Sequence, residues 1–232
     1  MTEAHTSISP FEGLPLLRLL QLVSPGLPVG AYAYSQGMEQ AAAGGWLRSA
    51  MDVEAWVEGL LRHSLARLEV PLFKRFYEAW QLGDLESLAF WSHWLLASRG
   101  TAELQAEERH MGRALQRLLV QLEVLSPELV RDLTPTFVAL FAAAACFWRI
   151  PLARGCEGLL WAWAENQVTA AIKLVPLGQT QGQRILMGVA GTIGEIVSEG
   201  LAFPDGEIGA SAPALGLASA RHETQHTRLF RS

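Results

Sequence analysis

Apolar residues recur along this chain at spacings of three and four residues, and this spacing is typical of one face of an α-helix. A short apolar helix that contains Leu14 and Leu22 is predicted to end at Ser24–Pro25. A longer helix is predicted from one continuous apolar stripe, which consists of Val53, Trp56, Val57, Leu60, Leu61, Leu65 and Leu68.

Capping signals place the next helix. Gly100 ends one helix and Thr101 is predicted to cap the following one. The apolar face of that helix consists of Leu104, Met111, Leu115, Leu118 and Leu122. Glu107, Glu108 and Arg109 fall on the other face of that helix.

Prolines mark helix boundaries in the second half of the chain. Pro135 suits the first turn of a helix that runs through Trp148. A further apolar helix is predicted from about Cys156 to Val175, because a residue that precedes proline disfavours helical backbone.

Leucine and alanine dominate over valine and isoleucine, and no convincing run of alternating strand residues occurs. The sequence therefore predicts an all-α fold, a single-domain bundle of about nine or ten helices over residues 13–220. Residues 1–12 are expected to form a flexible N-terminal arm, and residues 221–232 a polar tail.

Composition narrows the class of protein. Half of the residues are hydrophobic, 18% are charged and the net charge is −5, which excludes a disordered chain. Lys74 and Lys173 are the only lysines and no basic run exists, so we expect no nucleic-acid partner. The apolar excess favours an oligomer or stable protein partners.

The longest apolar run, Phe137–Trp148, has twelve residues and is too short to cross a membrane. The N-terminal segment lacks the basic and apolar regions of a signal peptide, so we expect a cytoplasmic protein. Cys146 and Cys156 are expected to be buried free thiols, with a single structural disulfide as the alternative.

Motifs for catalysis are absent. The chain has neither a P-loop nor a Gly-x-Ser-x-Gly sequence, and we expect no enzymatic activity. Gly188, Gly191 and Gly194 follow each other at a spacing of three within a helical pattern. We interpret them as a thin helix face that lets a neighbouring backbone approach closely, not as a phosphate-binding loop.

His222 and His226 are weak metal candidates. They are four residues apart, so a helix would place both imidazoles on one face. A divalent ion could then bind if a partner supplied another ligand. The alternative is a solvated polar tail that happens to contain two histidines.

Two polar stretches stand out from the apolar pattern. Two prolines and two glycines form a bend before Tyr32 and Tyr34, and this bend is either an interface or a buried corner between helices. Lys173 lies in the last turn of a predicted helix, where a cation is favourable. Gln179 and Gln183 would share a face of the next helix, unless Gln183 forms a capping box with Thr180.

These stretches carry a resemblance to a known family. The segments Ser24–Glu39, Trp161–Leu186, Arg221–Ser232 and Thr101–Gly112 resemble the UreF family of urease accessory proteins, in order and at compatible spacing. Gln105 departs from the pattern, because relatives often have arginine at that point.

The resemblance implies an all-α homodimer without catalytic activity that assists nickel insertion into urease. The implied partners are the accessory scaffold called UreD or UreH, the GTPase UreG and the urease apoprotein. It implies no directly bound cofactor, because nickel is handled by the complex. Direct nickel handling by this chain and GTPase activation are the alternatives, and Arg184 is the nearest candidate for an arginine finger.

The resemblance also implies roles for individual residues. Those that match the GTPase-facing patch are Tyr32, Lys173, Gln179 and Gln183. Those that match a C-terminal segment that orders on binding to the scaffold are Arg221, His222, Glu223 and Arg228. Leu17 and Trp161 match positions of apolar contact in the dimer.

Overall fold

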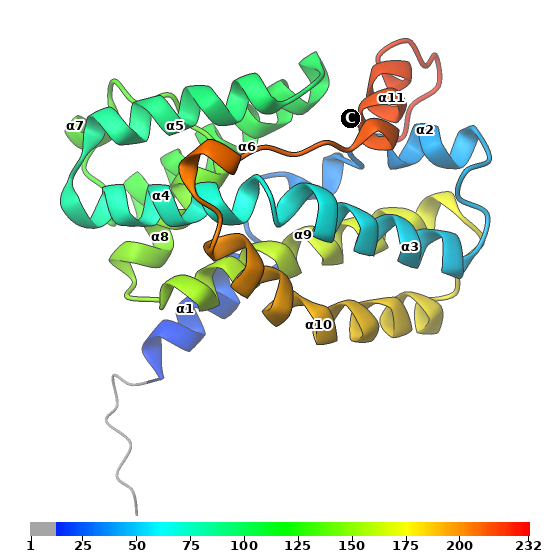
Figure 1. The fold of residues 1–232 in the computed structure, drawn as a ribbon, viewed down its shortest axis with the longest axis horizontal. Helices are drawn as coiled ribbons and strands as arrows, with labels where there is room; N and C mark the ends of the chain where they lie inside the picture. Colours follow the sequence, from blue (N-terminus) through cyan, green and yellow to red (C-terminus); the bar gives the residue numbers. More distant parts are fainter. Residues whose placement is uncertain (1–12) are drawn as a thin grey trace, which may run out of the picture.

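The computed structural model describes residues 13–232, and this part of the chain contains eleven α-helices and no strand (Figure 1). The helices are α1 (Leu14–Val23), α2 (Met38–Ala43), α3 (Ala50–Leu60), α4 (Glu69–Leu82), α5 (Leu85–Ser98), α6 (Ala102–Gln121), α7 (Pro127–Val130), α8 (Phe137–Phe147), α9 (Leu152–Leu174), α10 (Gln179–Leu201) and α11 (Pro213–His222). The predicted all-α fold is confirmed. The helix count is slightly higher than predicted because α2 and α7 have only six and four residues. The predicted flexible arm, residues 1–12, lies outside the described residues.

Helix α8 forms the centre of one half of the bundle. Every residue from Val138 to Ala145 is buried. Its run of four alanines leaves little side-chain volume, so α4, α6 and α9 pack closely around it. Phe141 meets Phe73 of α4 edge to face, with ring centroids 6.2 Å apart.

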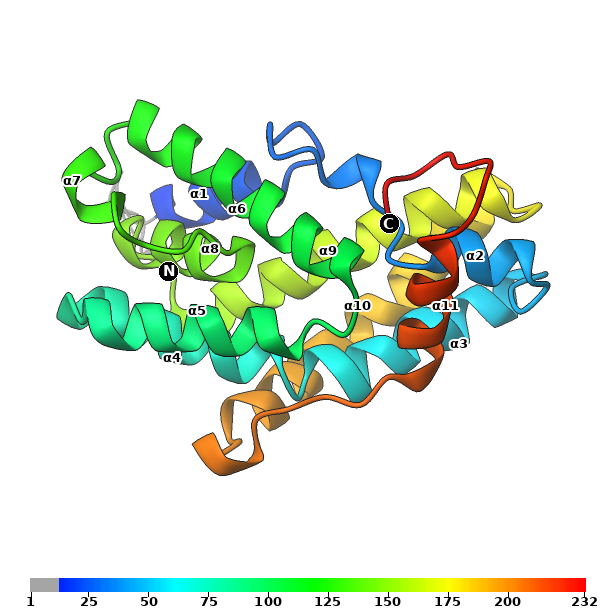
Figure 2. The same cartoon turned by 90° about the horizontal axis from the view of Figure 1, so that it is seen from above.

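Helices α9 and α10, both 23 residues long, form a long antiparallel pair in the other half (Figures 1 and 2). The predicted bend between them is confirmed, since Val175 is extended and ends α9. A Cβ atom on Gly182 would lie 2.7 Å from Cδ1 of Ile172, so the start of α10 packs directly on the end of α9.

The apolar stripe between Val53 and Leu68 does not form one continuous helix. Helix α3 ends at Leu60, and Leu61–Leu65 form a π-helical turn. Gly200 of α10 packs beside this irregular segment, where an added Cβ would lie 2.7 Å from the carbonyl oxygen of Ala66. The stripe is buried as predicted except for Trp56, which is half-buried, so the spacing identified the inward face but missed the break.

The interpretation of the α10 glycines was wrong. Gly188, Gly191 and Gly194 are exposed, and a Cβ on Gly191 or Gly194 would meet no atom within 4 Å. The close approaches of α10 occur instead at Gly182 and Gly200, on the face toward the bundle.

Of the other local predictions, the Thr101 cap and the free thiols are confirmed, whereas the place of Pro135 was wrong and Cys146 is only half-buried. The Thr101 hydroxyl accepts a hydrogen bond from Leu104 N and caps α6. Helix α8 starts at Phe137, so Pro135 lies just before it and not in its first turn. Cys146 and Cys156 are free thiols, which removes the disulfide alternative.

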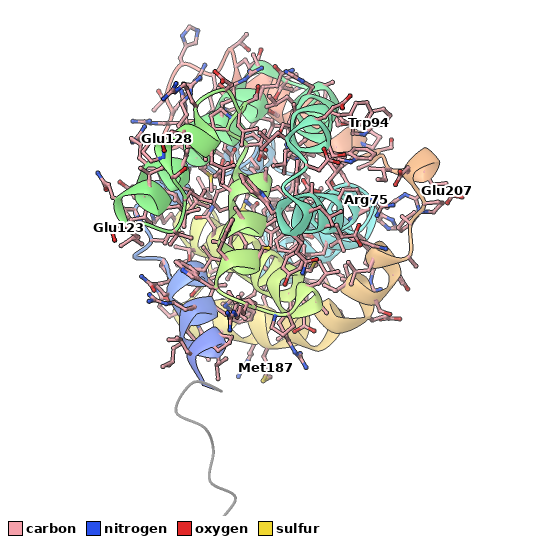
Figure 3. All side chains as sticks on the ribbon, turned by 90° about the vertical axis from the view of Figure 1, so that its left-hand side faces the viewer. Arg75, Trp94, Glu123, Glu128, Met187 and Glu207 are labelled. Carbon is pink, nitrogen blue, oxygen red and sulfur yellow. The ribbon has the colours of Figure 1, made fainter. Side chains whose placement is uncertain are left out.

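The segment after α10 is held to α4 by Arg75, which lies on the side of the molecule seen in Figure 3. Its Nη2 donates to the carbonyl of Phe203 at 2.7 Å and pairs with Asp205 at 2.6 Å. Among the residues of this structure, 13 to 232, no helix is both long enough and apolar enough to cross a membrane.

Candidate protein-binding site

The loop after α1 presents Tyr32 to solvent. A single turn of 3-10 helix, Ala31–Ala33, contains Tyr32 and is followed directly by Tyr34. Tyr32 is 69% exposed, whereas Tyr34 is buried and its hydroxyl lies 3.3 Å from Nδ1 of His110 on α6. The bend is therefore a buried corner at Tyr34, as one alternative predicted. An interface at the exposed Tyr32 stays a prediction.

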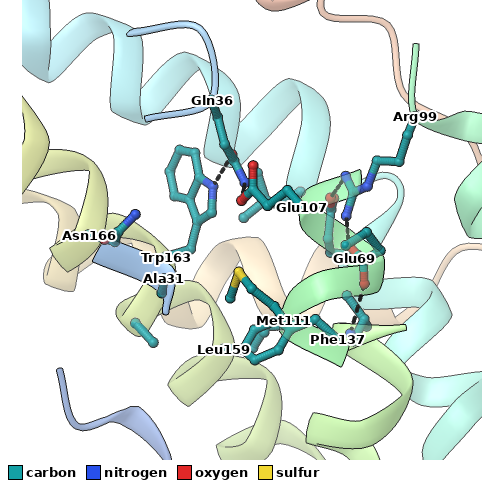
Figure 4. Close-up of a pocket in the computed structure, with 14 residues that line it drawn as sticks. Ala31, Gln36, Glu69, Arg99, Glu107, Met111, Phe137, Leu159, Trp163 and Asn166 are labelled. Carbon is teal, nitrogen blue, oxygen red and sulfur yellow. Dashed lines mark hydrogen bonds and ion pairs between the residues drawn. The ribbon is translucent and has the colours of Figure 1, made fainter. Parts of the chain in front are cut away.

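Gln36 fixes this loop to the bundle. Its backbone is left-handed (φ 51°), which is costly for a residue with a Cβ. Its side chain compensates, because the amide nitrogen donates to Glu107 Oε1 at 2.7 Å and the amide oxygen accepts from Trp163 Nε1 at 2.7 Å (Figure 4). Asn166 also donates to the carbonyl of Tyr34, at 3.0 Å.

Glu107 and Glu108 are buried, although they belong to the face of α6 opposite its predicted apolar face. Both side chains are only 5% exposed. Helix α6 packs on α8, and Glu107 is covered by Gln36 of the loop and Ser232 of the tail. Glu108 pairs with Arg99 at 2.7 Å and accepts a hydrogen bond from the backbone of Val138 at the start of α8. Arg99 also pairs with Glu69 of α4.

These groups line a partly open pocket of about 80 Å³ beside the loop (Figure 4). One guanidinium there faces three carboxylates, those of Glu69, Glu107 and Glu108. Burial raises the pKa of Glu107 to about 7, although hydrogen bonds from Gln36 and a tail serine act in the opposite direction.

The C-terminal tail, residues 223–232, turns back from α11 and ends beside the loop after α1 (Figure 2). Arg231 N donates to the carbonyl of Ala33 at 2.8 Å. The carbonyl of Ser232 accepts from the backbone and the hydroxyl of Ser35, at 2.9 and 2.6 Å. The tail therefore contributes to the same surface as Tyr32.

Two carboxylates hold the tail in place. Glu39 of α2 accepts hydrogen bonds from the backbone of Leu229 and Phe230, at 2.7 and 2.8 Å. Glu103 of α6 pairs with Arg228 at 2.7 Å. His222 lies between the two carboxylates, 2.7 Å from Glu103 and 3.3 Å from Glu39.

The residues predicted to meet the scaffold differ in accessibility. Arg221 is exposed and its guanidinium lies 5.8 Å from the ring of Trp46. Glu223 is also exposed and accepts a hydrogen bond from Ala102 N at the start of α6. Arg228 is exposed but paired, and His222 is fully buried, so in this arrangement His222 positions other groups and contacts no partner. The ordering of the tail by a partner stays a prediction.

The two tail histidines do not share a helix face, because α11 ends at His222. His226 is exposed in the turn beyond it, whereas His222 is buried. Over residues 13–232, no group of three or more histidine, cysteine, aspartate or glutamate side chains is arranged to hold a metal ion.

The residues predicted to face a GTPase lie on the surface. Lys173 is exposed at the end of α9, and Gln179 and Gln183 are exposed on the first turns of α10. The capping-box alternative for Gln183 is wrong, because Gln181 accepts the hydrogen bond from Gly178 N instead, at 3.0 Å.

The tail connects Lys173 with Tyr32. The Lys173 ammonium lies 5.6 Å from the ring centroid of Phe230, within the range of a cation–π contact. The next residue, Arg231, bonds to Ala33 beside Tyr32. The tail thus links Lys173 to the loop that carries Tyr32, through the buried ring of Phe230 and the backbone of Arg231. We call the exposed residues of this region, together with the predicted residues on the first turns of α10, the polar face: Tyr32, Lys173, Gln179, Gln183 and Arg231.

The predicted dimer residues come from α1 and α9, two helices that pack against each other. Leu17 is 62% exposed on α1, beside the exposed Leu16 and Leu20. The opposite side of α1 packs on Gly158 of α9 through Leu19 and Val23. Trp161, one turn after Gly158, is half-buried.

The structure defines an all-α protein in which most of the predicted functional residues are exposed, while His222 is buried and Trp161 is half-buried. A family model described as UreF matches residues 47–190. A protein of Alkalilimnicola ehrlichii named "Urease accessory protein UreF" is 50% identical, over 95% of this chain and 97% of the relative. Proteins of the same name from Azoarcus sp. and Marinobacter nauticus are 47% and 42% identical, over 97% and 98% of this chain and 100% and 99% of the relatives. The chain belongs to the UreF family.

Proposed function

We propose that this chain is a urease maturation factor, a non-catalytic homodimeric adaptor that acts in the cytoplasm. It bridges the UreD or UreH scaffold and the UreG GTPase while nickel is inserted into the urease apoprotein. The names of its relatives support the maturation role. The observation that carries the adaptor role is the polar face, in which the tail joins Lys173 to Tyr32.

The chemistry of the polar face suits a GTPase surface. Lys173 offers a cation to an acidic partner, and the amides of Gln179 and Gln183 can both donate and accept hydrogen bonds. Tyr32 adds a large exposed ring at low entropic cost.

The tail suits a second partner. Exposed residues of the tail and of the last turn of α11 carry charges of both signs, namely Glu223, Arg228 and Arg221. The tail is held by hydrogen bonds to Glu39, by the pairing of Arg228 with Glu103, and by Phe230, which is buried in the apolar core. A scaffold bound to the tail would therefore touch the segment that also forms part of the polar face.

The apolar surface of α1 supports the homodimer. Four leucines, Leu14, Leu16, Leu17 and Leu20, are between 43% and 62% exposed on one short helix. Association of two copies through this helix and Trp161 would remove that surface from water.

GTPase activation is the second candidate function, because Arg184 is exposed next to Gln183. An arginine finger reaches into the active site of its partner. Arg184 lies within α10, so a GTPase would have to bind along the side of this helix to contact its guanidinium.

Recruitment of the GTPase tests the adaptor role. We expect Lys173→Ala with Gln179→Ala to weaken recruitment by a complex of this chain and the scaffold, whereas scaffold binding and the fold survive. Arg154→Ala is a matched control, since it removes an exposed cation of α9 outside the polar face. Unchanged recruitment of the GTPase by the double variant contradicts the assignment. If Arg184→Ala slows GTP hydrolysis but leaves recruitment unchanged, the result favours the second candidate function.

A further inference from the structure

A basic hollow lies beside Tyr32, between α6, the loop after α1 and the tail. Three side chains of α6 form one wall: His110, Arg113 and Arg117, spaced by three and four residues on one helix face. The loop supplies the opposite wall from Val29 to Tyr34, and Arg231 of the tail lines it as well. The hollow has a volume of about 360 Å³.

The charge of this hollow is not balanced by its surroundings. No carboxylate belongs to its lining. Within residues 13–232, none of Arg113, Arg117 and Arg231 forms an ion pair. The chain as a whole carries a charge of −5, so three uncompensated guanidinium groups around one hollow favour a negatively charged ligand.

We propose that this hollow, the arginine hollow, binds an acidic segment of a protein partner through its carboxylates. A guanidinium presents parallel N–H donors that match the two oxygens of a carboxylate. Tyr32 stands in the same lining as Arg113 and Arg117. The identity of this partner rests on the proposed function, in which the GTPase contacts Tyr32.

The spacing of the arginines favours an extended peptide over a small anion. Arg113 and Arg117 are four residues apart on α6, a rise of about 6 Å along the helix. Alternate side chains of an extended peptide are about 7 Å apart and point to the same side. Two carboxylates at positions i and i+2 of such a segment can therefore meet one arginine each.

The tail determines whether the hollow is complete. Arg231 reaches its place because its own N–H bonds to Ala33 and the next residue bonds to Ser35. The four basic side chains come from α6 and from the C-terminal segment, which explains why the sequence shows no basic run.

A labelled hexaglutamate peptide tests the site directly, with the full chain at low ionic strength and fluorescence anisotropy as the readout. We expect Arg113→Gln/Arg117→Gln to bind at least tenfold more weakly than the unchanged chain. The control Arg48→Gln/Arg154→Gln removes the same charge from exposed positions outside the hollow and should bind within twofold of the unchanged chain. Thermal unfolding verifies that both variants fold.

Three results would overturn the proposal: no binding by the unchanged chain, equal weakening in both double variants, or displacement by inorganic phosphate at the same concentration of anionic groups. The purified GTPase then tests the identity of the partner. Displacement of the peptide by the GTPase supports it, and equal GTPase binding to the unchanged chain and to Arg113→Gln/Arg117→Gln refutes it. A GTPase that binds no form of the chain refutes the proposed function, while the peptide result still decides whether the hollow binds acidic segments.

Discussion

At the scale of single residues, Glu107 is the buried group whose charge is least supported. Arg99 is already paired with Glu69 and Glu108, so Glu107 depends on hydrogen bonds from Gln36 and Ser232. Burial destabilises the charged form of Glu107 more than these hydrogen bonds stabilise it. The pKa of Glu107 therefore rises to about 7. Since Gln36 belongs to the loop and Ser232 to the tail, the proton on Glu107 is linked to the segments that form the polar face.

The raised pKa of Glu107 predicts a pH dependence of stability. The ordinary pKa is 4.5, so between pH 4.5 and about 7 the folded chain holds a proton that the unfolded chain has lost. This group therefore lowers the free energy of unfolding as pH rises through that window, by at most about 3 kcal/mol. Glu107→Gln carries no such proton. We expect its stability relative to the unchanged chain to improve by up to about this amount between pH 5 and pH 8.

Urea unfolding at several pH values measures this difference. Glu78→Gln, which removes an exposed carboxylate of α4, is the control and should show a constant difference from the unchanged chain. A constant difference for Glu107→Gln as well would contradict the assignment of the raised pKa.

At the scale of elements, glycines determine how closely helices can pack. A Cβ on Gly112 of α6 would lie 2.6 Å from the carbonyl oxygen of Pro135 and 2.7 Å from the carbonyl carbon of Thr136. Both atoms are backbone at the start of α8, so neither can move without displacing that helix. Gly191 of α10, in contrast, is exposed and has no atom within 4 Å of an added Cβ.

These two glycines therefore predict opposite effects of the same substitution. We expect Gly112→Ala to lower the free energy of unfolding by about 1–3 kcal/mol through overpacking. We expect Gly191→Ala to raise it by about 0.5–1 kcal/mol, because alanine loses less backbone entropy in a helix. Denaturant unfolding of both variants measures the effects, and a neutral Gly112→Ala would contradict the described contact between α6 and α8.

The sequence could predict features that depend on neighbouring residues, but not features that depend on residues distant in the chain. Thr101 as a cap and the bend at Val175 were predictable, because they depend on neighbouring residues alone. The burial of Glu107 was not, since it depends on a loop and a tail that are distant in sequence. The arginine hollow was equally hidden, because Arg113 and Arg231 meet only in the folded chain. Most residues of the polar face came from a family resemblance, and the structure adds the tail contacts that link Lys173 to the loop of Tyr32.

At the scale of the whole molecule, the exposed leucines of α1 predict a homodimer. Leu17 is 62% exposed, so a charge at this position does not disturb the chain's own core. We expect Leu17→Glu to shift the dimer toward monomer in light scattering, because a carboxylate would have to be buried in the interface. Leu82→Glu places the same charge at another exposed leucine, at the end of α4, and should leave the dimer intact. A dimer that survives Leu17→Glu would place the interface elsewhere.

The most direct test of the adaptor role is size exclusion with light scattering on mixtures of the purified chain, the scaffold and the GTPase. We predict a dimer alone, a larger species with the scaffold, and a further increase in mass when the GTPase is added. The last increase should disappear in Lys173→Ala/Gln179→Ala and persist in Arg154→Ala. A chain that associates with neither partner, or a double variant that still adds the GTPase in full, would contradict the account.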